Sequence, residues 1–202
     1  MRWKVCGMRE PKNISEVAAL QPNYMGFILW DGSKRYCPKP QQVPDQITKV
    51  GVFVDADVMK IENAIENYKL GAVQLHGNES PGLCRELQGK IQVIKAFGIS
   101  EGFDFGTLTD YLPYCDFFLF DTKGLMPGGN GTTFDWAILE KYAFDLPFFI
   151  SGGIGLAEVD KINELRNTDL PLYAIDINSK FETAPALKDA EQLKEFKEKL
   201  SL

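Results

Sequence analysis

The chain has 202 residues, of which 45% are hydrophobic and 25% are charged. This length suits one domain that buries about 70% of the surface its unfolded chain exposes, so we expect residues 1–202 to form a single domain. The formal net charge of −6 disfavours nucleic acid as a partner, because a phosphate backbone requires a basic surface. A small anionic ligand is still compatible with this charge, since a few local hydrogen-bond donors suffice to hold one.

The four cysteines and the single histidine argue against both a metal centre and a disulfide framework. Cys6, Cys37, Cys84 and Cys115 lie far apart and form no CxxC pair. The first residues do not form an apolar signal segment, and no apolar run reaches the length of a membrane span. We therefore expect a cytoplasmic protein with free thiols and no membrane partner.

Strand-like segments recur through the whole chain. Eight short runs have the near-continuous apolarity of parallel strands that are buried on both faces. These runs are 3–8, 24–30, 49–55, 72–77, 91–98, 115–121, 147–153 and 172–178.

Helical patterns lie between these runs. Apolar residues recur every three or four positions over 57–68 and over 189–200, and Asp189 is the expected N-cap of the second segment. Shorter helices are expected to begin at Asn13, Ser80 and Asp135, whereas 99–114 has little periodicity. Eight strands with about eight crossovers predict a (β/α)8 TIM barrel in the α/β class. A doubly wound open sheet is the alternative, but no GxGxxG motif follows the first strand.

Polar and reactive side chains stand where these strands end, and in a barrel the carboxyl ends of all strands surround one catalytic mouth. The candidates, in chain order, are Cys6, Ser33, Arg35, Gln74, His76, Lys95, Asp121, Ser151, Asp176, Asn178 and Ser179. Each also has a structural interpretation: Cys6 as a small buried hydrophobe, His76 as a polar rim residue, Asp121 as a turn residue and Lys95 as part of a structural ion pair. The other three cysteines are interpreted as structural.

Two glycine-rich segments follow predicted strands. Gly152 and Gly153 stand between an apolar strand and a helical stretch, where backbone N–H groups can approach a ligand closely. Because barrels commonly bind phosphate after strands seven and eight, we expect a phosphate site at Gly152, Gly153, Asn178 and Ser179. The segment 127–133 lacks the lysine of a nucleotide-binding loop and is expected to be a flexible loop over the mouth.

Several of these segments, in this order, resemble the phosphoribosylanthranilate isomerase family. The quoted motifs are KVCGM, then VGVFVDADVMKIENAIENYKLGAVQLHGNESP, FDTKG, GGNGTTFDW, ISGGI and IDINSKFE, the last followed by Lys188-Asp189. The resemblance runs from residue 4 to residue 189. Two departures stand out: Lys34 replaces a proline before Arg35, and Lys180 and Ala186 stand where the family usually has glycines. These departures affect the details of the expected phosphate loop, to which Lys180 would add a cation.

The resemblance implies an Amadori rearrangement of N-phosphoribosylanthranilate in tryptophan biosynthesis, without metal or cofactor. It implies Asp121 as the general acid that opens the sugar ring and Cys6 as the general base that takes a proton from the neighbouring carbon. Arg35 would bind the anthranilate carboxylate and Asp176 the amine or sugar hydroxyls, with Gln74 and His76 as further substrate contacts. The partner is thus a small phosphosugar, and the protein is expected to be a monomer or a homodimer.

Two other functions fit a barrel of this kind. One is the related histidine-pathway aldose–ketose isomerase, which pairs two aspartates where this chain has Cys6 and Asp121. The other is a catalytically silent binding barrel, which would have no reason to keep Cys6, Asp121 and Arg35 together. An assay of phosphoribosylanthranilate turnover distinguishes the three.

Overall fold

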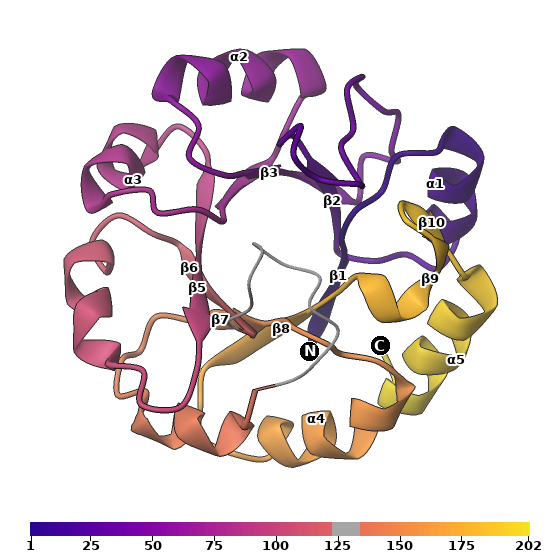
Figure 1. Cartoon of the computed structure of the whole chain (residues 1–202). Coiled ribbons are helices and arrows are strands. Elements are labelled where there is room, and N and C mark those ends of the chain that lie inside the picture. Colours follow the sequence, from indigo (N-terminus) through magenta and orange to yellow (C-terminus); the bar gives the residue numbers. More distant parts are fainter. Residues whose placement is uncertain (123–133) are drawn as a thin grey trace.

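The computed structural model describes residues 1–122 and 134–202, and it contains a closed barrel of eight parallel strands (Figure 1). Each strand pairs with the next along the chain, and β8 closes the ring by pairing with β1. The strands are β1 (Arg2–Val5), β2 (Tyr24–Ile28), β3 (Thr48–Phe53), β4 (Ala72–Leu75), β5 (Gln92–Ile99), β6 (Phe117–Thr122), β7 (Phe148–Ile150) and β8 (Leu172–Ile177). The predicted barrel is confirmed, and the open sheet is excluded because its edges would be unpaired.

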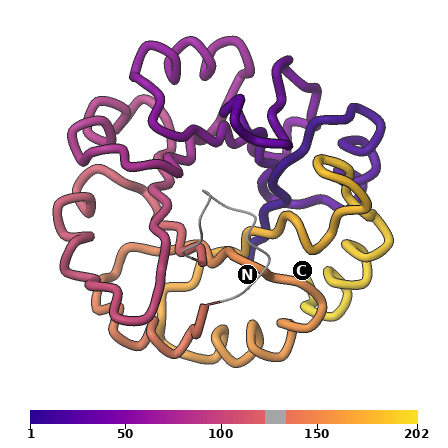
Figure 2. Tube along the Cα trace, viewed as in Figure 1, coloured from indigo at the N-terminus to yellow at the C-terminus, as the bar shows by residue number. Residues whose placement is uncertain are grey.

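Helices surround this barrel on the outside, as the trace in Figure 2 also shows. The α-helices are α1 (Pro11–Ala18), α2 (Val58–Tyr68), α3 (Pro81–Leu87), α4 (Val159–Arg166) and α5 (Ala190–Leu200). The 3-10 helices are η1 (Phe105–Tyr111), η2 (Trp136–Lys141), η3 (Leu156–Glu158) and η4 (Ser179–Phe181). A small antiparallel pair, β9 (Glu182–Ala184) and β10 (Leu187–Lys188), precedes α5.

The helical connections are fewer and shorter than the expected eight. Residues 29–47, between β2 and β3, contain turns and no helix. The aperiodic segment 99–114 folds as the 3-10 helix η1, and the helix expected after Asp135 is the 3-10 helix η2. These segments lack a regular apolar stripe, so packing does not extend them into α-helices.

Helix starts follow the predicted caps in three cases out of four, since Asp135 also caps η2. Ser80 and Asp189 accept hydrogen bonds from the backbone N–H groups at the starts of α3 and α5. The expectation for Asn13 is wrong, because α1 begins at Pro11 and Asn13 is buried inside it. The Asn13 side chain instead exchanges two hydrogen bonds with the backbone of Lys188, at 2.8 and 2.7 Å. A short polar residue thus joins α1 to the last β-pair.

The core has two separate parts. Side chains alternate between the two faces of each strand, so one set points into the barrel and the other toward the helices. The inner set includes Tyr24, Ile94, Phe117, Leu119 and Phe149, which form their own apolar cluster. Because this cluster fills the barrel interior, the inward-facing positions nearer the carboxyl ends of the strands are left for polar side chains.

Candidate active site

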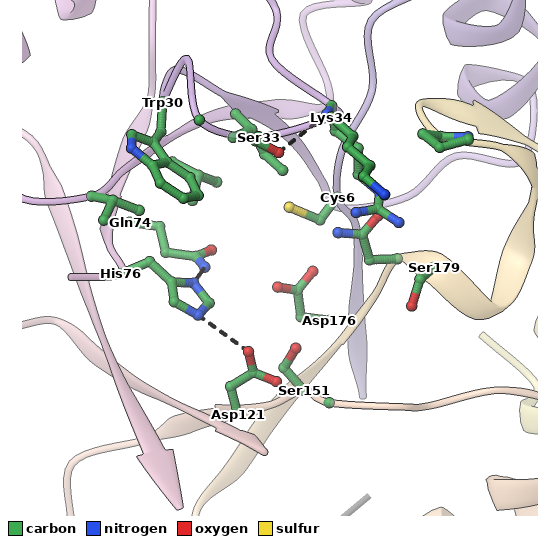
Figure 3. A pocket seen from close by; sticks show the side chains of 18 of the residues that line it. Cys6, Trp30, Ser33, Lys34, Gln74, His76, Asp121, Ser151, Asp176 and Ser179 are labelled. Atoms are coloured by element: carbon green, nitrogen blue, oxygen red, sulfur yellow. Dashed lines mark hydrogen bonds and ion pairs between the residues drawn. The ribbon is translucent and has the colours of Figure 1, made fainter. Parts of the chain in front are cut away.

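Strand periodicity brings the polar candidates to one end of the barrel. Residues two apart on a strand face the same side, so Lys4 and Cys6 point inward together, as do Gln74 and His76. The structure gathers the polar side chains around a cavity of about 390 Å³. All ten predicted site residues line it: Cys6, Arg35, Gln74, His76, Asp121, Gly152, Gly153, Asp176, Asn178 and Ser179. Figure 3 shows Cys6, Asp176 and Asp121 pointing into this same space.

Cys6 is the nucleophilic group of the cavity. Gly26 on the adjacent strand leaves room for its sulfur, since a Cβ atom there would come within 2.6 Å of the Cys6 Sγ. Burial raises the pKa of the Cys6 thiol above its ordinary value, and Asp176 adds to that rise. The ammonium groups of Lys4 and Lys188 act in the opposite direction. The thiol is therefore a buried group that depends on nearby cations to ionise.

Asp121 is the carboxyl group of the cavity at the end of β6. One carboxylate oxygen lies 3.1 Å from the Nε2 of His76, and the other accepts from the backbone N–H of Thr122 at 2.9 Å. Gly152, which has a φ of +89°, passes so close that a Cβ atom there would lie 2.8 Å from the Asp121 Oδ1. A side chain at position 152 would clash with Asp121 and would strain the backbone, so the close approach requires glycine.

Asp176 and Lys4 form a buried ion pair beside these two groups. The Lys4 Nζ donates to the Asp176 Oδ2 at 2.7 Å, and both side chains are almost completely buried. Burial raises the pKa of Asp176, while Lys4 opposes that rise. Within the described residues the other oxygen, Oδ1, is buried and has no hydrogen-bond partner. A buried acceptor of this kind is costly to leave unpaired, and a ligand donor in the cavity would satisfy it.

Arg35 stands at the rim and already has a carboxylate partner. Its Nε and Nη2 donate to Glu182, with the shortest distance, 2.7 Å, from Nη2 to Oε2. Glu182 also accepts from Lys188 at 2.6 Å. Burial acts against ionisation of Glu182, but Arg35 and Lys188 outweigh it and hold the pKa of Glu182 below its ordinary value. The Nη1 group of Arg35 remains directed to no acceptor among the described residues.

The glycine segment after β7 lines the cavity together with Asn178 and Ser179. Gly152 and Gly153 both have positive φ, and their backbone N–H groups donate to no acceptor within the described residues. Lys188 donates to the Asn178 Oδ1 at 2.7 Å and so fixes that side chain. The cavity is therefore lined by the open backbone donors of Gly152 and Gly153, together with Asn178 and Ser179.

Lys180 and Ala186, which replace glycines of the family pattern, follow β8 in the sequence. Lys180 is exposed and does not line the cavity, contrary to the expectation that it would add a cation there. Ala186 is buried with a φ of +67°, and its N–H donates to Glu182 at 3.1 Å. The chain thus keeps a left-handed conformation at this position with alanine in place of glycine.

Sequence reasoning missed the apolar wall of the cavity and three charged residues that contact the site. The apolar wall of the cavity comes from Ile28, Trp30, Val52 and Val54. Lys4, Glu182 and Lys188 contact the candidate residues from buried positions. Only Lys4 carried a usable signal, because it precedes Cys6 by two positions on a predicted strand. Lys95, by contrast, is buried outside the cavity and pairs with Glu79 at 3.0 Å, which agrees with its structural interpretation.

The described part of the chain contains neither a cluster of metal ligands nor a membrane-spanning helix. No group of three His, Cys, Asp or Glu side chains converges there in a way that would hold an ion. None of the described helices combines the length and apolarity needed to cross a bilayer. The loop expected at 127–133 lies outside the described residues.

Fold and site together define a (β/α)8-barrel enzyme that places a thiol and a carboxyl group across one small polar cavity. The chain matches the family model described as N-(5'phosphoribosyl)anthranilate (PRA) isomerase over residues 3–199. It is 47% identical to the N-(5'-phosphoribosyl)anthranilate isomerase of Parabacteroides distasonis, over 96% of this chain and 90% of that one. The chain belongs to the phosphoribosylanthranilate isomerase family.

Solved structures agree with this assignment. The phosphoribosyl anthranilate isomerase of Thermotoga maritima superposes with a TM-score of 0.86 at 30% identity, covering 100% of this chain and 98% of that one. A second isomerase structure, with a TM-score of 0.83 and 28% identity over the same shares, is a complex with reduced 1-(o-carboxyphenylamino)-1-deoxyribulose 5-phosphate.

Proposed function

We propose that this chain converts N-(5'-phosphoribosyl)anthranilate to 1-(o-carboxyphenylamino)-1-deoxyribulose 5-phosphate, as a cytoplasmic step of tryptophan biosynthesis. Cys6 is the general base and Asp121 the general acid. The observation that carries these roles is that both groups reach one cavity from β1 and β6, with the unpaired Asp176 Oδ1 between them. The rearrangement moves protons and one oxygen bond, so it needs no cofactor.

The first step is ring opening by Asp121. The protonated carboxyl gives its proton to the ring oxygen of the sugar, the bond from that oxygen to C1 breaks, and the nitrogen lone pair forms a C1=N bond. The carboxylate left behind accepts from the backbone N–H of Thr122 and lies 3.1 Å from the Nε2 of His76. The Thr122 donor, and a His76 that carries its proton on Nε2, stabilise the charge that develops on Asp121 as the proton leaves.

The second step is proton removal by Cys6. The thiolate takes the proton from C2, and the electron pair of that bond forms C1=C2 while the iminium nitrogen becomes neutral. The resulting enolamine becomes the ketone when C1 gains a proton and the C2 hydroxyl loses one. Burial and Asp176 disfavour the ionised thiol, and the ammonium groups of Lys4 and Lys188 favour it.

The two ends of the substrate bind to different groups of the cavity. The free Nη1 of Arg35 suits the anthranilate carboxylate, and the apolar wall that includes Trp30 suits the aromatic ring. The phosphate suits the open N–H groups of Gly152 and Gly153, with Asn178 and Ser179 beside them. A substrate amine or hydroxyl would donate to Asp176.

The experiment that tests this proposal is turnover of purified protein, followed by the loss of substrate fluorescence as the non-fluorescent product forms. We expect the fluorescence to decay to completion and the product mass to equal the substrate mass. A folded barrel that leaves the substrate unchanged would show a silent binding protein. Turnover of the histidine-pathway aldose in its place would show the related isomerase.

A further inference from the structure

A series of contacts through Lys4, Gln74 and His76 connects the two proton-transfer groups. It begins at the ammonium group of Lys4, which is fully buried inside the barrel. An ammonium group has three donors and no acceptor. In this structure those donors reach the Gln74 Oε1 at 2.7 Å and the Asp176 Oδ2 at 2.7 Å, and the ammonium group attracts the ionised thiol of Cys6.

The bond from Lys4 fixes which way the Gln74 amide points. Because Lys4 only donates, the Gln74 atom that faces it must be the oxygen, and the NH2 group must face His76. The Gln74 Nε2 lies 2.7 Å from the His76 Nδ1. That ring nitrogen must therefore accept, so it carries no proton.

The proton of a neutral His76 then stands on Nε2, which lies 3.1 Å from the Asp121 Oδ2. The ring consequently presents a donor to Asp121, the group that becomes a carboxylate when it gives up its proton. Without the Gln74 amide held by Lys4, either tautomer would be available, and one of them would present a bare nitrogen to the carboxylate.

At its other end the same ammonium group faces the thiol. Lys4 lies on β1 and Cys6 follows two positions later, directly after the strand, so both side chains point into the barrel on the same side. The other charged groups facing the thiol are Asp176 on β8, Lys188 on β10 and Arg35 from the segment after β2. Of the cations that favour the ionised thiol, Lys4 acts more strongly than Lys188.

We propose that Lys4 is a positioning residue for both proton transfers: it stabilises the thiolate of Cys6 and, through Gln74, fixes the His76 tautomer that donates to Asp121. The inference rests on the proposed function for the roles of Cys6 and Asp121. The ionisation of Cys6 and the tautomer of His76 are both measured without substrate. The role of Lys4 can therefore be disproved while the proposed reaction stands, and the proposed reaction can be disproved while the role of Lys4 stands.

The test compares Lys4→Met with Lys95→Met. The control also removes a buried ammonium group from a barrel strand, but Lys95 pairs with Glu79 outside the cavity. The first readout is the rate at which iodoacetamide labels Cys6, followed against pH by mass spectrometry of the peptide that contains it. We expect the midpoint to rise by about one pH unit or more in Lys4→Met and to stay unchanged in Lys95→Met.

The second readout uses the fact that the chain contains one histidine. Nitrogen-15 NMR then reports a single imidazole, and we expect the unsubstituted protein to carry the proton on Nε2 with a bare Nδ1. In Lys4→Met the Gln74 amide is free to turn, so both tautomers should appear, whereas Lys95→Met should match the unsubstituted protein. The proposal is overturned if Lys4→Met matches Lys95→Met in either readout.

A further variant covers the case in which Lys4→Met does not fold. Gln74→Glu keeps an acceptor for Lys4 but replaces the donor that faces His76 with a second acceptor. We expect the proton to move to the Nδ1 of His76 in that variant. A proton on Nδ1 in the unsubstituted protein, or one that stays on Nε2 alone in Gln74→Glu, would overturn the proposal.

Discussion

Two buried lysine clusters on opposite faces of the barrel wall differ in how completely they are satisfied. On the outer face, the Lys95 ammonium group donates to Glu79 and to three backbone carbonyl groups. Glu79 in turn accepts from the backbone N–H groups of Asp55 and Gly77. Each polar atom of this outer cluster has a partner within the protein.

The inner cluster is built from the same chemistry but is left open. Lys4 pairs with Asp176 as Lys95 pairs with Glu79, yet the Asp176 Oδ1 faces the cavity without a partner among the described residues. A closed cluster stabilises the fold and can do little else, because it has no atom left for a ligand. An open one costs stability and gains a binding surface. The difference predicts that substitutions at the inner site lower turnover and keep the fold, whereas substitutions in the outer cluster lower stability and keep turnover.

The largest loss of turnover is expected from Cys6→Ser, in the cavity beside the inner cluster. A hydroxyl is far too weak an acid to supply the base, so turnover should fall to the background rate while the fold is kept. The fluorescence assay and circular dichroism measure the two properties. Cys37→Ser is the matched control, since Cys37 is equally buried but lies outside the cavity, and it should retain activity. Normal turnover in folded Cys6→Ser would remove Cys6 from its role.

A smaller loss is expected from Asp121→Asn. The amide keeps the size of the side chain and can still accept from His76, but it has no acidic proton to give. General acid catalysis contributes about 10²- to 10⁴-fold, so kcat should fall by that much with KM largely kept. A change in KM alone would make Asp121 a binding residue and would place the acid elsewhere.

The outer cluster should behave in the reverse way. Glu79→Gln leaves the Lys95 ammonium group buried without its countercharge, and breaking a buried pair costs about 3–5 kcal/mol of the free energy of unfolding. Denaturant unfolding measures this loss. At a temperature where the variant is still folded, kcat and KM should match those of the unsubstituted protein. A loss of kcat at full folding would show that the two clusters are not separate in function.

The smallest effect is expected at the rim, from Arg35→Ala. Losing a charge-assisted pair costs about 1.5–3 kcal/mol, or roughly 10- to 150-fold in affinity for the reduced product analogue. Binding of inorganic phosphate should be nearly unchanged, whereas Gly153→Val should show the opposite pattern. Lys34 is the neighbouring cation that could replace part of the contact. Equal losses for ligands with and without the carboxylate would show that the substrate lies the other way round.

The fold and the membership of the cavity could be predicted from the sequence because both follow from local rules. Buried parallel strands produce apolar runs, and residues at their carboxyl ends meet at one mouth, so Gln74, Asp121 and Asp176 were expected to lie together. The absence of a helix between β2 and β3 could not be predicted. The expectation of about eight crossovers came from the strand count and from apolar stripes in other connections, which do not report on residues 29–47.

Long-range pairing is what the sequence could not show. Nothing near Arg35 indicates that Glu182, 147 positions away, already occupies two of its donors. Nothing near Asp121 likewise indicates that His76, 45 positions away, lies 3.1 Å from its carboxyl group. Such contacts depend on barrel closure, which brings distant strands together.

The measurement that tests the central claim most directly is inactivation by iodoacetamide followed together with labelling at each of the four thiols. If the open inner cluster is the reaction site, loss of turnover should follow labelling of Cys6 alone, and the reduced product analogue should slow both to the same extent. Cys37, Cys84 and Cys115 are buried outside the cavity, and labelling there should not track the loss. Protein that is fully labelled at Cys6 and still turns over substrate would contradict the account.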